Sequence, residues 1–234
     1  MKILIIWDFD GVIADSEKLW SQNWVDMLKQ KKGIELTHQQ TKDLIIGVSE
    51  KTKIFRLKKA FPNMEIDAGF LDEIHQNEIN LIDNVMEATP GIEAIFKDNR
   101  FVHCIATGAT KDMNIRKLKR LGFDKYFDEK NCFTADMVDK GKPHPDLFLL
   151  AAKKMNVSPQ DCIVIEDATS GFLAAREAQM TVVAFVGAEN NNTTEYRKIC
   201  KEHNVDGIFA TMTELHKFLK NMQQTKNISN DKQR

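Results

Sequence analysis

Two acidic residues stand where the first apolar run of the chain ends. Asp8 and Asp10 lie at the end of the run KILIIWDF (residues 2–9), and Gly11 follows, which allows the chain to turn sharply. In an open α/β sheet, ligands bind outside the carboxyl ends of the strands. Two carboxylates held there without a basic neighbour would repel each other, so they favour a bound cation. Hard oxygen ligands suit Mg²⁺. The alternative is that both acids only begin a turn.

A second acidic pair ends another apolar run. Glu166 and Asp167 close residues 161–167 (DCIVIED), and small residues then open a helical pattern. An aspartate at this point could complete the metal site that Asp8 and Asp10 begin. The alternative is that the pair only complements the N-terminal dipole of the following helix.

Two further segments suit phosphate. Thr107 and Gly108 follow an apolar run and offer a hydroxyl and backbone N–H groups, which suit a phosphate oxygen, although Thr-Gly turns are also common without a ligand. Lys142 stands in a loop with two prolines in three residues, which restrict the backbone and place the cation. This loop is not a P-loop, because no glycine stands five residues before Gly141 and Pro143 replaces the Ser/Thr.

The apolar runs that must position these groups predict a parallel sheet. They are continuous rather than alternating, which indicates strands covered on both faces. Amphipathic segments lie between them, so we expect an α/β fold with a doubly wound, Rossmann-like parallel sheet. The predicted strands lie within residues 2–9, 101–107, 131–135, 161–167, 181–186 and 207–210. The predicted helices of this core lie within 112–122, 145–156, 169–180 and 212–222.

One stretch breaks this alternation. Residues 16–89 contain no convincing strand, and their pattern is helical from Asp15 or Ser16 to Gly33, at 52–60 and at 67–85. We therefore predict a core formed by residues 1–15 and 90–222, with an all-helical domain inserted at 16–89. Residues 223–234 are polar and lack an apolar face, so they are predicted to be disordered.

Composition narrows the class of protein. The 234 residues include 33 Lys and Arg and 34 Asp and Glu, a formal net charge of −1, which argues against a general nucleic-acid binder. No apolar run approaches the roughly 20 residues that cross a bilayer, and acids interrupt the start too early for a signal peptide. The cysteines are too widely spaced for a CxxC pair, which favours reduced thiols. We expect a soluble, cytoplasmic protein. The cysteines are Cys104, Cys132, Cys162 and Cys200.

In this order and context the motifs resemble the haloacid dehalogenase-like (HAD) superfamily of phosphotransferases. The motifs are DFDGV at 8–12, ATG at 106–108, the lysine of GKPHPDLF at 141–148 and EDATSG at 166–171. The resemblance extends from Met1 to about Phe209 and includes the insert, which is similar to the helical cap of these proteins. DSE at 15–17 and GKPHPDLF are similar to the β-phosphoglucomutase and sugar-phosphatase branch.

The resemblance implies a role for each acid. Asp8 would be the nucleophile that forms an aspartyl-phosphate, and Asp10 the general acid and then the general base. Mg²⁺ would be held by the carboxylates of Asp8 and Asp167 and by the main-chain carbonyl of Asp10. Glu166 would lie behind these ligands or act through a water molecule.

The resemblance also implies how phosphate is bound. Thr107, the Gly108 N–H and Lys142 would bind the phosphoryl oxygens and offset charge in the transition state. The expected function is a Mg²⁺-dependent phosphatase of a small phosphorylated metabolite, in particular a sugar phosphate, that acts as a monomer or weak dimer. Dehalogenation is disfavoured, because dehalogenases need neither Mg²⁺ nor a second aspartate at the Asp10 position. Asp10 and Asp167 favour phosphate chemistry instead.

Two alternatives remain. The first is a β-phosphoglucomutase-like phosphosugar mutase. The loop Gly47-Val48-Ser49 resembles one that faces the mutase active site, but the next position is Glu50, where the mutases carry an arginine that grips a second phosphate. That difference places the mutase second, unless Lys51, Lys53 or Arg56 substitutes. The second alternative is a catalytically inactive module that binds a protein through its cap.

Overall fold

The structure, a computed structural model, describes residues 2–46, 50–188 and 191–231. The chain divides into two compact units. One unit is formed by Met1–Asp15 together with Glu87–Arg234, and the other by Ser16–Met86. Among the helices of these described residues, none combines the length and the apolar composition that crossing a membrane requires.

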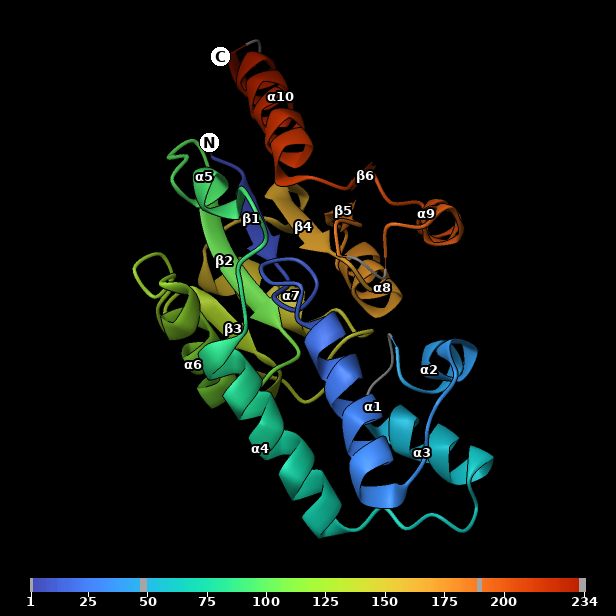
Figure 1. Ribbon diagram of the computed structural model, residues 1–234. Helices are drawn as coiled ribbons and strands as arrows, with labels where there is room; N and C mark the ends of the chain where they lie inside the picture. Colours follow the sequence, from blue (N-terminus) through green and yellow to red (C-terminus); the bar gives the residue numbers. More distant parts are fainter. Residues whose placement is uncertain (1, 47–49, 189–190, 232–234) are drawn as a thin grey trace. The chain divides into compact units, whose positions relative to one another are not determined.

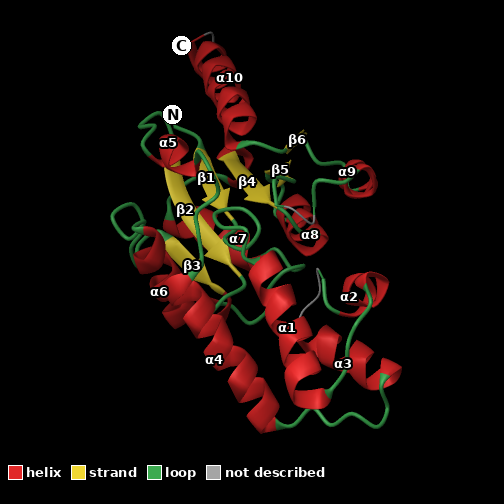
Figure 2. Ribbon diagram, in the orientation of Figure 1, coloured by secondary structure: helices red, strands yellow, loops and turns green. Residues whose placement is uncertain are grey.

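A six-stranded sheet forms the centre of the first unit, in the order β3-β2-β1-β4-β5-β6. Every neighbouring pair is parallel, and the arrows of β1, β2, β3 and β4 in Figure 2 point the same way. The predicted doubly wound α/β fold is confirmed, and each predicted run contains one strand. The strands are β1 Leu4–Trp7, β2 Val102–Thr107, β3 Cys132–Thr134, β4 Cys162–Glu166, β5 Thr181–Phe185 and β6 Gly207–Phe209.

Strand β1 is buried on both faces, which explains its unbroken apolar sequence. Leu4 and Ile6 belong to a core cluster that includes Phe148 and Phe172 from helices on one face of the sheet. Trp7 points to the opposite face, because successive strand side chains alternate. There it packs edge-on against Phe96, with ring centroids 5.4 Å apart. Helices therefore cover both faces, as a doubly wound sheet requires (Figure 1).

The helices of this unit alternate with the strands as predicted, and two further helices are present among the described residues. The predicted segments contain α7, α8, the start of α10 and all of α6 except Lys111, whereas α5 and α9 were not predicted. Helix α6 ends at Gly122, whose φ of 67° and whose N–H bonds to Leu118 and Lys119 close the last turn. The helices are α5 Ile92–Phe96, α6 Lys111–Leu121, α7 Asp146–Lys154, α8 Thr169–Glu177, α9 Thr194–Glu202 and α10 Met212–Asp231.

The C-terminal segment differs from its prediction. Disorder was expected from residue 223, but α10 continues through Asp231. Met212, Leu215 and Leu219 bury the first half of α10, and polar contacts hold the helix against the core beyond residue 222. Gln223 Oε1 accepts a 2.9 Å hydrogen bond from the backbone N of Ile3, and Lys226 Nζ lies 2.6 Å from Asp161 Oδ1. Both partners are far away in the sequence, so the polar composition of the segment did not indicate these contacts.

The second unit is all-helical. Its core contains Trp24, Leu57, Phe70 and Ile74, all almost fully buried. Asn23 Nδ2 donates a 3.0 Å hydrogen bond to the Ile74 carbonyl and so connects the first helix to the last. Three of the helices overlap the predicted ones, and α2 was not predicted. The helices are α1 Glu17–Lys32, α2 His38–Leu44, α3 Glu50–Ala60 and α4 Ala68–Asn84.

Candidate active site

The register of the central strands brings the predicted site residues to one edge of the sheet. Trp7 of β1 is level with Ile105 of β2 and Ile165 of β4. The backbone N of Asp8 donates a 2.9 Å hydrogen bond to the Ile165 carbonyl, which extends this pairing by one residue. The residues that follow β1, β2 and β4 therefore lie side by side at their carboxyl ends, where α/β sheets bind ligands.

Three carboxylates meet at this edge. Oxygen atoms of Asp8, Glu166 and Asp167 all lie within 4.8 Å of one another. Asp8 is only 7% exposed and Glu166 only 1%. Burial of several ionised carboxylates together is costly unless positive charge compensates them. The donor set consists of hard oxygen atoms alone and so fits Mg²⁺ better than a softer metal.

Two glycines permit this close packing. A Cβ atom on Gly11 would lie 1.9 Å from Asp167 Oδ2, and one on Gly171 would lie 1.9 Å from Glu166 Oε1. Gly11 also has a φ of 82°, which other residues rarely adopt. A side chain at either position would displace a carboxylate of the cluster.

Lys142 supplies positive charge to the cluster. Its Nζ lies 2.5 Å from Asp8 Oδ1 and 2.7 Å from Glu166 Oε1. Burial raises the pKa of Asp8 to about 7, although the Lys142 ammonium acts in the opposite direction. Burial alone would lower the pKa of Lys142, but attraction by Asp8 and Glu166 outweighs it and holds that pKa above its usual value. The loop lysine is thus a charged partner of the acids.

Both oxygens of Glu166 are engaged. Oε1 accepts from Lys142, and Oε2 accepts hydrogen bonds of 2.8 and 2.7 Å from the backbone N atoms of Asp167 and Ala168. These bonds fix Glu166 at the end of β4 and also hold the main chain that leads into α8. The structure therefore places Glu166 within the carboxylate cluster, directly against the lysine.

Asp167 is oriented by two residues that sequence analysis missed. Asn191 Nδ2 donates a 3.0 Å hydrogen bond to Asp167 Oδ2, and Tyr196 Oη donates to the Asp167 main-chain carbonyl. Neither residue belongs to a strand-end motif, so no pattern in the sequence marked them.

Asp10 lies apart from the carboxylate cluster. Its two carboxylate oxygens are each 2.6 Å from Nζ of Lys117, whose side chain is 5% exposed. Sequence analysis did not identify Lys117, because Arg116 and Lys119 are basic residues beside it in α6 and no spacing rule distinguishes among them.

The predicted phosphate-binding segment ends β2. Thr107 is buried, and its Oγ1 accepts a 3.2 Å hydrogen bond from the backbone N of Ala109. Gly108 is exposed. The segment leads into α6, so the hydroxyl and the backbone N–H groups lie beside the edge where Asp8 emerges.

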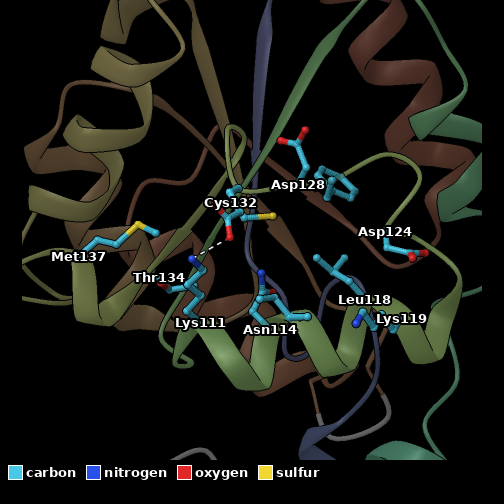
Figure 3. Close-up of a pocket in the computed structure, with 12 residues that line it drawn as sticks. Lys111, Asn114, Leu118, Lys119, Asp124, Asp128, Cys132, Thr134 and Met137 are labelled. Carbon is cyan, nitrogen blue, oxygen red and sulfur yellow. Dashed lines mark ion pairs between the residues drawn. The ribbon is translucent and has the colours of Figure 1, made fainter.

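A separate pocket of about 230 Å³ lies between α6 and the edge strand β3 (Figure 3). Asn114 and Leu118 line it from α6, Cys132 and Thr134 from β3, and Met137 from the following turn. None of the residues that line it belongs to the carboxylate cluster. Within the part of the chain that the structure describes, the predicted site and this pocket are therefore distinct.

Comparison with known proteins identifies the class. A family model described as haloacid dehalogenase-like hydrolase matches residues 5–185, most of the chain. The protein therefore belongs to the haloacid dehalogenase-like hydrolases. Its similarity to phosphatases of this family places it in the sugar-phosphatase-like branch and identifies it as a phosphatase.

Two relatives and two solved structures are among the proteins that this chain resembles. The phosphorylated carbohydrates phosphatase of Thermotoga maritima is 30% identical, over 74% of this chain and 80% of its own. The 6-phosphogluconate phosphatase of Escherichia coli is 26% identical, over 83% and 87%. A conserved haloacid dehalogenase-like protein of Agrobacterium tumefaciens shares the fold with a TM-score of 0.83, at 23% identity over 95% and 99% of the chains. A β-phosphoglucomutase of Clostridium difficile has a TM-score of 0.72, at 25% identity over 97% and 100%.

Proposed function

We propose that this protein is a Mg²⁺-dependent phosphatase that hydrolyses a sugar phosphate through an aspartyl-phosphate intermediate. The observation that carries the proposal is the buried group formed by Asp8, Glu166 and Asp167, with Lys142 bound to two of its members. Such a group can hold a divalent cation and an anionic phosphoryl group side by side.

The reaction proceeds in two steps. In the first, an Asp8 oxygen attacks phosphorus, the phosphorus–oxygen bond to the sugar breaks, and Asp10 gives its proton to the departing alkoxide. In the second, Asp10 takes a proton from water, the water oxygen attacks phosphorus, and the acyl phosphate bond breaks. Inorganic phosphate leaves, and both carboxyl groups regain their starting states.

The residues around Asp8 would bind Mg²⁺ and the phosphoryl group and would compensate the negative charge of the phosphoryl oxygens. Asp8 and Asp167, with the main-chain carbonyl of Asp10, would hold Mg²⁺, which when bound offsets the charge of the phosphoryl oxygens. Lys142 offsets the same charge from the protein. Thr107 and the Gly108 N–H would bind phosphoryl oxygens as β2 passes into α6.

The helical unit would act as a cap that excludes water and selects the substrate. Its residues weigh against the mutase alternative. The loop at 47–49 lies outside the described residues, but Glu50 lies 2.7 Å from His75. Lys53 is buried with its Nζ 6.0 Å from the Trp24 ring, and Arg56 donates to the Asp43 carbonyl. Lys53 and Arg56, two of the three residues that could replace the mutase arginine, therefore make contacts within the helical unit itself.

We also propose a cytoplasmic location. Cys104, Cys132, Cys162 and Cys200 are all buried and free. Burial raises the pKa of each thiol, so the thiols act as apolar groups of the core.

For the oligomeric state, we propose a monomer or a weak dimer, which light scattering would measure.

The test is phosphate release from a panel of sugar phosphates, with Mg²⁺ and with EDTA. The panel includes the compounds for which relatives are named, 6-phosphogluconate, fructose 1-phosphate and a hexitol phosphate. We expect Mg²⁺-dependent release that Asp8→Asn abolishes. Release unaffected by EDTA would overturn the metal requirement. Activity that depends on a sugar bisphosphate, with isomerised sugar as product, would favour the mutase.

A further inference from the structure

Lys117 is a buried cation in the middle of α6. Its side chain is 5% exposed, and its Nζ lies 2.6 Å from each carboxylate oxygen of Asp10. On another side the ammonium lies 5.1 Å from the centre of the Phe9 ring. A buried ammonium needs an opposite charge beside it, so the ion pair with Asp10 holds the Lys117 side chain in this position.

The contact restrains the orientation of Asp10. Contact with both oxygens defines the rotation of the carboxylate about its last bond as well as its position. The main chain of Asp10 is restrained separately. Gly11 N donates a 2.8 Å hydrogen bond to the Ala14 carbonyl, and Ile13 N donates one of 2.8 Å to the Phe9 carbonyl. Backbone and side chain of Asp10 are thus held by different parts of the fold.

Helix α6 connects this contact to the phosphate-binding segment. Thr107 ends β2, α6 begins at Lys111, and Lys117 lies two turns into the helix. A helix transmits position with little distortion, because its backbone hydrogen bonds resist stretching. The partner of Asp10 therefore lies on the helix that directly follows the proposed phosphate-binding groups.

We propose that Lys117 is a positioning residue that holds the Asp10 carboxylate in the orientation from which it exchanges a proton with the leaving alcohol. This inference rests on the proposed function, in which Asp10 serves as general acid and base. In this role Lys117 acts through Asp10 and not by contact with substrate or metal. Its effect is confined to steps that need the proton of Asp10.

The experiment compares Lys117→Met with Lys119→Met, a variant two residues away on the exposed side of the same helix. The substrates are the sugar phosphate hydrolysed fastest in the panel above and p-nitrophenyl phosphate, whose phenolate leaves without a proton. For Lys117→Met we expect kcat/KM for the sugar phosphate to fall about 10- to 100-fold, as when an outer partner of an active-site group is lost. We expect kcat/KM for p-nitrophenyl phosphate to stay within about threefold, because that step needs no general acid. Lys119→Met should leave both values unchanged.

A second comparison separates positioning from a general structural effect. If Lys117 acts through Asp10, then Asp10→Asn with Lys117→Met should be no slower on the sugar phosphate than Asp10→Asn alone. Equal losses on both substrates, multiplicative losses in the double variant, or an unchanged Lys117→Met enzyme would each overturn the proposal. If Lys117→Met does not fold, Lys117→Gln, which keeps a polar donor, takes its place in the same comparisons.

The proposed function is judged first, on the unaltered protein. If the unaltered protein releases no phosphate from either substrate, the phosphatase proposal fails and this inference fails with it. If the unaltered protein is active, only the Lys117 variants decide the inference.

Discussion

The ammonium of Lys142 lies 2.5 Å from the Oδ1 atom of Asp8, although 133 residues separate the two positions in the chain. The same ammonium contacts Glu166, so one lysine compensates two buried carboxylates. Lys142 lies in the connection between β3 and α7, so this loop brings it to the acids.

Substitution of Lys142 should affect both stability and activity. In Lys142→Met, Asp8 and Glu166 lose a cation that both contact, and removal of one member of a buried ion pair costs about 3 kcal/mol. We expect kcat/KM to fall about 10²- to 10³-fold, as when one donor to a transition-state oxygen is removed. Urea unfolding and steady-state kinetics measure the two effects. Lys140→Met, at an exposed position in the same loop, is the control. A Lys142→Met enzyme with full activity would contradict the assigned role.

The close packing of Gly11 against Asp167 can be tested by comparing Gly11→Ala with Gly122→Ala. Gly11 and Gly122 have φ values of 82° and 67°, so alanine at either position costs about 1 kcal/mol in backbone strain. Only at Gly11 would the new Cβ collide with Asp167, since nothing lies within 4 Å of a Cβ on Gly122. We expect Gly11→Ala to lose Mg²⁺ binding and activity, and Gly122→Ala to keep both. Titration calorimetry and phosphate release measure this, and similar activities in the two variants would refute it.

Asn191 should influence Mg²⁺ affinity without touching the metal. Its amide donates to Asp167 Oδ2, and partners of this kind orient metal ligands. In Asn191→Ala we expect Mg²⁺ affinity to fall about 10- to 100-fold, measured by titration calorimetry. Asn192→Ala, at the exposed neighbouring position, should bind Mg²⁺ like the unaltered protein. An unchanged affinity in Asn191→Ala would show that Asp167 is held well enough by other contacts.

His103 makes stability depend on pH. Burial lowers its pKa to about 4, and its Nδ1 accepts a 3.2 Å hydrogen bond from Trp7 Nε1. In the unfolded chain its pKa is about 6.5. Between these values the unfolded state binds the proton and the folded state does not, so stability falls as pH drops.

The expected loss from His103 between pH 7 and pH 5 is about 2 kcal/mol of unfolding free energy. His103→Gln keeps an acceptor for Trp7 but cannot take up this proton. Between pH 7 and pH 5 its unfolding free energy should therefore fall by about 2 kcal/mol less than that of the unaltered protein. Urea unfolding at the two pH values measures the difference. His38→Gln, at an exposed position, should show the same pH dependence as the unaltered protein. Parallel pH curves for His103→Gln and the unaltered protein would contradict the prediction.

Some elements that sequence analysis missed had local signals. The segment before α2 contains Thr37 followed three residues later by Gln40, and in the structure these two form a capping box. Thr193 likewise caps α9 by accepting from Tyr196 N. Helix α2 is short and polar, so apolar periodicity could not predict it. Helix α9 is also short, but Tyr196, Ile199 and Cys200 stand at helical spacing, a signal that sequence analysis missed. The end of α10 had no such signal, because its anchors Ile3 and Asp161 are remote in sequence.

The sequence by itself determined the parallel sheet and the edge at which the acids meet. Continuous apolar runs indicate strands covered on both faces, and parallel strands present their carboxyl ends at one edge. The sequence therefore predicts that Asp8 lies beside Glu166 and Asp167. Only the tertiary structure decided the partners of these acids. Lys117 and Asn191 are polar residues of a helix and a loop, where neither periodicity nor spacing distinguishes them from their neighbours. Lys142 was predicted from its loop, but its pairing with Asp8 and Glu166 was not. A charge partner is selected by three-dimensional approach and burial, which the packing of the whole unit creates and no local segment encodes.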